Sequence, residues 1–153
     1  MIRKKYIRWV PAVAWMGVIF YLSAQPSGES SELSKGVMRV VIQTIGDGLS
    51  LDKGMLHQGI RKGAHLGAYF VLAVLVMSAL EAKHRKSTYQ IGITLAICFG
   101  YAISDEVHQL YVPGRSGEVR DVMIDTAGAA LGILSYIVVR KIFKQLKKSK
   151  QVT

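Results

Sequence analysis

This chain of 153 residues is poor in cysteine, in acidic residues and in repeated sequence. Its one cysteine, Cys98, rules out an internal disulfide and is expected to be a small apolar core residue. No short metal-ligand signature, internal repeat or low-complexity tract is present. Only 10 acidic residues stand against 20 Lys and Arg. The chain is therefore neither a disulfide scaffold nor a repeat protein.

Hydrophobic residues, by contrast, make up 50% of the chain, and the mean hydropathy is +0.27. This composition is typical of a membrane protein. A helix needs about 20 mostly apolar residues to cross a bilayer core, and four stretches approach this length: residues 9–24, 60–80, 89–110 and 121–139. We therefore predict an all-α, polytopic membrane protein. A single domain, residues 1–153, would contain a bundle of four transmembrane helices.

The net charge of +10 predicts an orientation in the membrane rather than a nucleic-acid partner. Lys and Arg cluster in residues 3–8, 83–86 and 140–150, and four crossings would place all three clusters on one side. By the positive-inside rule that side is the cytoplasm, so both termini are predicted to be cytoplasmic. A cleaved signal peptide is the competing interpretation, but cleavage after Ala24 would place Leu22 where a small residue is needed.

The segments outside the four stretches also carry patterns. Residues 33–45 have apolar side chains at helical spacing, which predicts a short amphipathic helix on the outer surface. It would be either a lid over an outer site or a connector resting on lipid headgroups. The basic tail, residues 140–153, is expected to contact anionic lipids.

Polar residues converge when the second stretch is placed on a helix at 100° per residue. Arg61, His65 and Tyr69 form one stripe. A second stripe, on roughly the opposite side, holds small residues suited to close helix contact: Gly59, Gly63 and Gly67. At the end of the first stretch, Ser23 and Gln25 lie at the same predicted depth and could line a pocket with the polar stripe.

The third and fourth stretches add acidic residues at that depth. The third carries Asp105, Glu106, His108 and Gln109, and its opposite arc is apolar and expected to meet lipid. The fourth has one stripe of carboxylates and small residues that should face the bundle: Asp121, Asp125, Gly128 and Gly132. The sequence VPGR, residues 112–115, predicts a tight turn between the two helices that directs Arg115 toward the acids.

An ionised carboxylate within a bilayer is costly, and it is retained in a sequence only where it is paired, hydrated or needed for function. This cluster is therefore the candidate site. Acid–base chemistry would use carboxylates and imidazoles; the candidates are Asp105, Glu106, His108, His65, Asp121 and Asp125. Substrate binding would use Arg61, Arg115, Tyr69 and Gln109. A metal, if one binds, would use Asp105, His108, His65 and Asp125. A structural clamp is the alternative, joining Arg61 to Asp125 or Arg115 to Asp121.

Four motifs resemble the VanZ-like family of bacterial membrane proteins: FYLSAQP at 20–26, RKGAHLGAY at 61–69, SDEVHQLYVPGR at 104–115 and DVMIDTAGAALG at 121–132. The resemblance implies a four-helix protein of the bacterial cytoplasmic membrane, with a role in resistance to the glycopeptide antibiotic teicoplanin. It also implies these signature residues: Arg61, Lys62, His65, Tyr69, Asp105, Glu106, His108, Gln109, Arg115, Asp121, Asp125 and Gly128. Many relatives have an acidic residue where this chain has Ala68.

Three hypotheses about function follow. The first is a cell-envelope protein whose outer polar pocket engages a lipid-linked cell-wall precursor or a phospholipid headgroup, which would make membrane lipids its partners. The second is a membrane hydrolase or transferase acting on a lipid-linked substrate. The third is a small transporter or structural subunit, and a transporter of only four helices would have to be a homo-oligomer. The sequence names no cofactor.

Overall fold

The computed structural model describes residues 6–26, 36, 53–81 and 87–149, with the backbone alone for residues 53–57. Within these ranges the chain forms four helices and no strand. They are α2 (Val10–Ser23), α4 (Lys53–Glu81), α5 (Ser87–Gln109) and α6 (Val119–Ser149). The prediction of an all-α fold is confirmed. Apart from residue 36, the predicted amphipathic helix at 33–45 lies outside the described residues.

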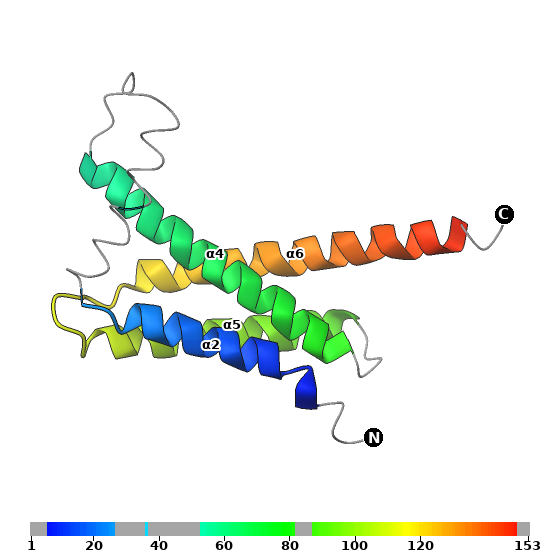
Figure 1. The fold of residues 1–153 in the computed structure, drawn as a ribbon, viewed down its shortest axis with the longest axis horizontal. Helices are drawn as coiled ribbons and strands as arrows, with labels where there is room; N and C mark the ends of the chain where they lie inside the picture. Colours follow the sequence, from blue (N-terminus) through cyan, green and yellow to red (C-terminus); the bar gives the residue numbers. More distant parts are fainter. Residues whose placement is uncertain (1–5, 27–35, 37–52, 82–86, 150–153) are drawn as a thin grey trace.

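The four helices run in alternating directions, so that α2 begins and α6 ends at the same end of the molecule (Figure 1). Helix α2 carries Pro11 in its first turn, where the missing N–H costs nothing. Helix α6 has Asp121 in its first turn and Lys147 and Lys148 in its last, which matches the helix dipole at both ends. It continues beyond the predicted span to Ser149, because Lys, Arg and Gln are good helix formers.

Two helical segments are long and apolar enough to cross a membrane, Gln58–Glu81 and Val119–Ser149. Less than half of each apolar window is buried within the chain, so much of the apolar surface faces outward. Helix α2 is apolar but shorter, and α5 buries polar residues such as Gln90 and Thr94. The structure thus bears out the apolar helices in α4 and α6, while crossing by all four helices stays a prediction.

The most extensive contact in the molecule is between α4 and α6, which cross closely. Glycine makes the crossing possible, because a Cβ atom on Gly128 or Gly132 would overlap the carbonyl oxygen of Leu66 or Phe70 in α4. The burial predicted for this stripe of α6 is confirmed. The contact predicted for the glycine stripe of α4 is wrong, since no described atom lies within 4 Å of a Cβ built on Gly59, Gly63 or Gly67.

Helix α2 is held to its neighbours by hydrogen bonds to backbone carbonyls. Trp15 Nε1 donates to Ala68 O of α4 at 2.9 Å, and the Tyr101 hydroxyl of α5 donates to Met16 O at 2.6 Å. Cys98 is fully buried in the hydrophobic core, as predicted. At the end of the bundle where α6 leaves it, Arg140 Nε contacts Glu81 Oε1 at 2.8 Å. These contacts fix α2 and the C-terminal end of α4 to the rest of the bundle.

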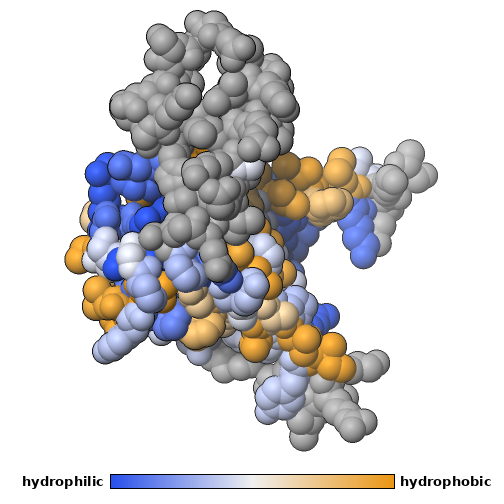
Figure 2. All heavy atoms as spheres, turned by 60° about the vertical axis from the view of Figure 1, so that its left-hand side comes forward, coloured by the Kyte–Doolittle hydropathy of each residue, from blue (hydrophilic) through white to orange (hydrophobic). Residues whose placement is uncertain are grey.

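The turn between α5 and α6 has the predicted form. Arg115 N donates to Val112 O at 3.1 Å, and Gly114 has a φ of 75°, as required at the third position of a type II turn. Gly117 is also required, because a Cβ there would lie 2.7 Å from Glu106 O. The turn lies at the end of the molecule that comes forward in Figure 2, where hydrophilic side chains gather.

Candidate functional site

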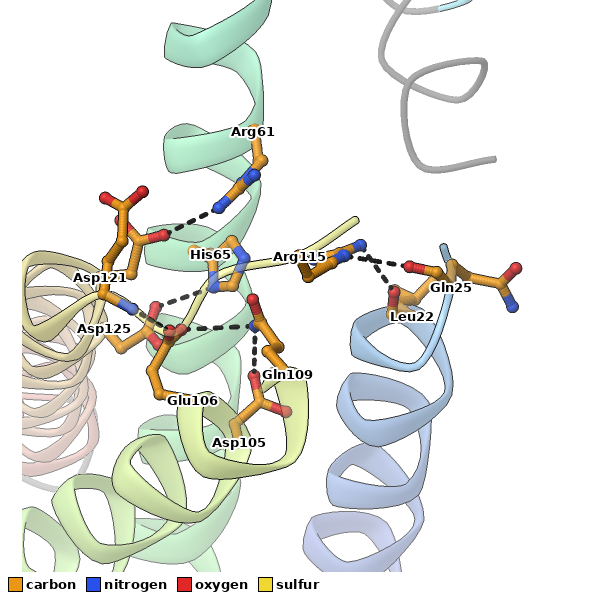
Figure 3. A network of polar contacts seen from close by, with 11 residues as sticks. Leu22, Gln25, Arg61, His65, Asp105, Glu106, Gln109, Arg115, Asp121 and Asp125 are labelled. Atoms are coloured by element: carbon orange, nitrogen blue, oxygen red, sulfur yellow. Dashed lines mark hydrogen bonds and ion pairs between the residues drawn. The ribbon is translucent and has the colours of Figure 1, made fainter. Parts of the chain in front are cut away.

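A network of polar side chains fills the end of the bundle at which α2 and α5 end and α6 begins (Figure 3). Four of its carboxylates are buried: Asp105, Glu106, Asp121 and Asp125. They come from the last turns of α5 and the first turns of α6, and α4 passes beside both. The helix faces predicted from the sequence therefore place these acids inside the molecule.

Helix α4 supplies a guanidinium and an imidazole partner to the acids of α6. Arg61 Nη2 donates to Asp121 Oδ2 at 3.2 Å, and His65 Nδ1 lies 3.3 Å from Asp125 Oδ1. Residues 61 and 65 are one helical turn apart in α4, and residues 121 and 125 are one turn apart in α6. Two successive turns of α4 therefore pair with two successive turns of α6. Arg61 thus pairs with Asp121 rather than with Asp125, the partner expected for a clamp.

Glu106 connects α5 to the start of α6. Its Oε2 accepts a hydrogen bond from the backbone N–H of Glu118 at 2.8 Å, just before the first residue of α6. A carboxylate in this place accepts a hydrogen bond from an N–H group that has no partner within the helix. The helix dipole also stabilises the negative charge of the carboxylate. Gln109 Nε2 donates to Glu106 Oε1 at 3.3 Å and to Asp105 Oδ2 at 3.5 Å, which fixes both carboxylates.

Arg115 does not contact the acids but holds the end of α2. Its Nε donates to Gln25 O at 3.0 Å, and its Nη2 donates to Leu22 O at 3.5 Å. An arginine that satisfies carbonyls at a helix C-terminus is also favoured by the helix dipole. Burial, and next the positive charge of Arg61, lower the pKa of Arg115. The positive charge of Arg61 thus disfavours the charged form of Arg115.

A cavity of about 180 Å³ opens between α2, α4 and this turn. Its polar lining consists of Ser23, Arg61, His65, Tyr69, Asp105 and Arg115. Its apolar lining consists of Ile19, Leu22, Ala64 and Ala68. A second, more polar hollow of about 210 Å³ shares Arg61 and adds Gln58, Lys62, Glu118 and Arg120. An anionic group with an apolar tail fits such a combination of cations and apolar wall.

The remaining predicted site residues are less central. His108 stacks on Phe20 of α2 with ring centroids 4.3 Å apart, so its ring packs against α2 rather than pointing into the acid cluster. Tyr69 is fully buried and lines the cavity, and its hydroxyl has no hydrogen-bond partner among the described residues. The sequence interpretation included Ser23 but missed Phe20, because stacking on a distant helix leaves no signal in helical spacing.

Metal-capable side chains form one group in the described part of the chain: His65, Glu106 and Asp125. Each offers a ligand atom, and these atoms lie within 4.8 Å of one another. His65 and Asp125 belong to the set predicted for a metal, whereas Asp105 and His108 do not join this group. Glu106 takes their place because its carboxylate reaches toward α6 (Figure 3).

Long apolar helices with exposed hydrophobic faces, and charged residues gathered at one buried end, indicate a small helical membrane protein. Comparison with protein families agrees: the VanZ/LLP1 family model matches residues 8–140. The chain belongs to this family, as its motifs predicted. Searches of curated proteins and of solved structures find no match to the chain. Every member of the polar network in Figure 3 lies within the matched range.

Proposed function

We propose that this VanZ-family protein crosses the bacterial cytoplasmic membrane four times and uses its polar end, on the outer face, to bind an anionic envelope lipid or lipid-linked precursor. Through this binding it would lower sensitivity to teicoplanin-type antibiotics. The cavity carries the proposal, because two arginines and an apolar wall meet in it. The resistance role follows from the family, and the ligand class follows from the cavity.

The two guanidinium groups of the cavity favour an anion, and Asp105 is the carboxylate in its lining. Arg115 is half-buried, and the positive charge of Arg61 disfavours its charged form. A phosphate or pyrophosphate between Arg61 and Arg115 would offset their positive charges and accept hydrogen bonds from both guanidinium groups. Lys62 and Arg120 in the neighbouring hollow would draw the anion toward the opening.

The apolar wall favours a lipid over a free phosphate. Ile19, Leu22 and Ala68 line the cavity on the α2 and α4 side. The outer surface of α2 is apolar as well, with Val13, Phe20 and Tyr21 exposed. A headgroup in the cavity could therefore keep its acyl chain against α2, in the hydrocarbon region of the bilayer.

The test is growth inhibition by teicoplanin and by vancomycin in a susceptible Gram-positive host. The host expresses the wild type, Arg115→Gln in the cavity, or Lys141→Gln at the opposite end of the bundle, with membrane abundance measured by immunoblot. We expect protection by the wild type and by Lys141→Gln, and loss of protection by an equally abundant Arg115→Gln. Equal protection by both variants would exclude the cavity from the function.

Asp105→Asn separates binding from chemistry. It keeps the shape of a side chain that lines the cavity but removes its charge and its basicity. If the protein acts by binding alone, Asp105→Asn should keep the protection. A complete loss at normal abundance would instead favour the hydrolase or transferase hypothesis, in which a carboxylate takes part in proton transfer.

A further inference from the structure

Three helices each deliver one metal-capable side chain to a single point in the bundle. His65 comes from α4, Glu106 from α5 and Asp125 from α6, and their ligand atoms lie within 4.8 Å of one another (Figure 3). Neighbours on one helix surface meet because of helical periodicity alone. Residues from three separate helices meet only because the packing of the bundle brings them together.

Asp125 has the fewest protein contacts of the three residues in this group. Its side chain is fully buried, and its Oδ1 contacts His65 Nδ1 at 3.3 Å. Its Oδ2 has no hydrogen-bond partner among the described residues. A buried ionised carboxylate is stable only when its charge and its lone pairs find partners. Asp125 is therefore oriented toward a ligand that those protein contacts do not provide.

The charges around the group point to a cation. Arg61 is paired with Asp121, and Arg115 is turned toward the carbonyls of α2. The remaining buried carboxylates of the network are Asp105, Glu106 and Asp125, and the imidazole of His65 lies beside them. Three carboxylates against one imidazole leave an excess of negative charge in a low-dielectric interior. A divalent cation would neutralise this excess.

We infer that His65, Glu106 and Asp125 bind one divalent transition-metal ion, either Zn²⁺ or Mn²⁺. One imidazole nitrogen and two carboxylates suit these ions better than Mg²⁺ or Ca²⁺, which prefer oxygen alone. In a tetrahedral site with bonds of about 2.1 Å, ligand atoms lie about 3.4 Å apart. The separation of 3.3 Å between His65 Nδ1 and Asp125 Oδ1 fits this value. The ligand atom of Glu106 lies within 4.8 Å of the other two.

The surroundings of the group resemble the outer shell of a metal site. Ligating carboxylates are normally held by further hydrogen bonds, and Glu106 accepts them from Gln109 Nε2 and from Glu118 N. His65 also lines the cavity, so a remaining coordination position would face the ligand proposed to bind there. The metal site itself does not depend on that ligand, because its occupancy is measured without lipid or antibiotic.

Metal binding by the purified full chain in detergent tests the inference. After chelation and desalting, the wild type should take up about one Zn²⁺ or Mn²⁺ per chain in competition with an indicator dye. Asp125→Asn and His65→Gln should weaken this binding by about tenfold or more, and Gln109→Ala, which alters only the outer shell, by about tenfold. Glu81→Gln removes a carboxylate at the opposite end of the bundle and should bind as the wild type does.

A second measurement uses the wild type alone, in case the variants do not accumulate. Pulsed electron paramagnetic resonance of the Mn²⁺-loaded protein should detect coupling to a histidine nitrogen, from His65. Absence of metal uptake by the wild type would overturn the inference, and the carboxylates would then be held protonated or hydrated. Unchanged affinity in Asp125→Asn, or a bound Mn²⁺ without nitrogen coupling, would overturn it as well.

Discussion

Two ion pairs of this protein join the same kinds of group in different surroundings. The Arg61–Asp121 pair includes a carboxylate whose side chain is 1% exposed, whereas Glu81, the partner of Arg140, is 37% exposed. Removing the arginine from a buried pair leaves an uncompensated charge, which costs about 3 to 5 kcal/mol. A pair whose two side chains are both about a third exposed is worth at most about 1 kcal/mol, because water partly replaces the lost partner.

We therefore expect Arg61→Gln to lower the free energy of unfolding by about 3 kcal/mol. Arg140→Gln should lower it by about 1 kcal/mol or less. Reversible denaturation of the purified protein in mixed micelles, followed by circular dichroism, measures both values. Equal losses in the two variants would show that Asp121 gains a replacement partner, such as water entering from the cavity.

The sequence predicted which residues face the polar network, but not which residues contact one another. The Arg61, His65 and Tyr69 stripe was found by periodicity, and all three residues do face the polar network or its cavity. Arg115 was expected to meet an acid but binds backbone carbonyls of α2. Every helix end offers such carbonyls, and a sequence does not mark which of them lies within reach of a distant arginine.

Among the helices, α4 and α6 each carry a stripe of glycine, but the two stripes have different surroundings. Gly128 and Gly132 of α6 press against the backbone of α4, whereas Gly59, Gly63 and Gly67 of α4 have no described neighbour within 4 Å. Periodicity shows which residues share a face of a helix. It does not show which neighbouring helix covers that face, so the sequence indicated two packing surfaces where the structure uses one.

This difference predicts opposite effects for one substitution. Gly128→Ala should lower the free energy of unfolding by about 3 kcal/mol, because its Cβ would push against the carbonyl oxygen of Leu66. Gly63→Ala should raise it by up to about 1 kcal/mol, since alanine is the better helix former and open space surrounds the position. Denaturation in micelles measures both. Destabilisation by Gly63→Ala would mean that a further surface, such as a second copy of the chain, covers this stripe.

For the whole molecule, the sequence predicted four helices and their order, and the four described helices begin and end within a few residues of the predicted limits except at two places. Helix α4 begins at Lys53 rather than residue 60, and α6 continues to Ser149. Both extensions carry charged residues, which end an apolar pattern without ending a helix. The apolar pattern therefore predicts which part of a helix could lie in a membrane, but it does not predict where the helix begins and ends.

The predicted orientation can be tested because the chain has one cysteine and that cysteine is fully buried. A cysteine introduced by Ser116→Cys, in the α5–α6 turn, should react with a membrane-impermeant maleimide added to intact cells. One introduced by Lys148→Cys, at the far end of α6, should react only after permeabilisation. Cys98 in the unmodified chain provides the background. Labelling of Lys148→Cys in intact cells would contradict the proposed topology, because it would place the C-terminal end of α6 outside the cell.

The close partnership of α4 with α6 also has a consequence for biosynthesis. Arg61 and Asp121 are separated by 60 positions, and α5 is made between the two helices. While the ribosome completes α5, the polar groups of Arg61 and His65 and the surface of α4 at Leu66 and Phe70 have yet to meet their partners in α6. In the proposed topology, α4 is therefore inserted with these groups unpaired, and they stay unpaired until α6 has been synthesised.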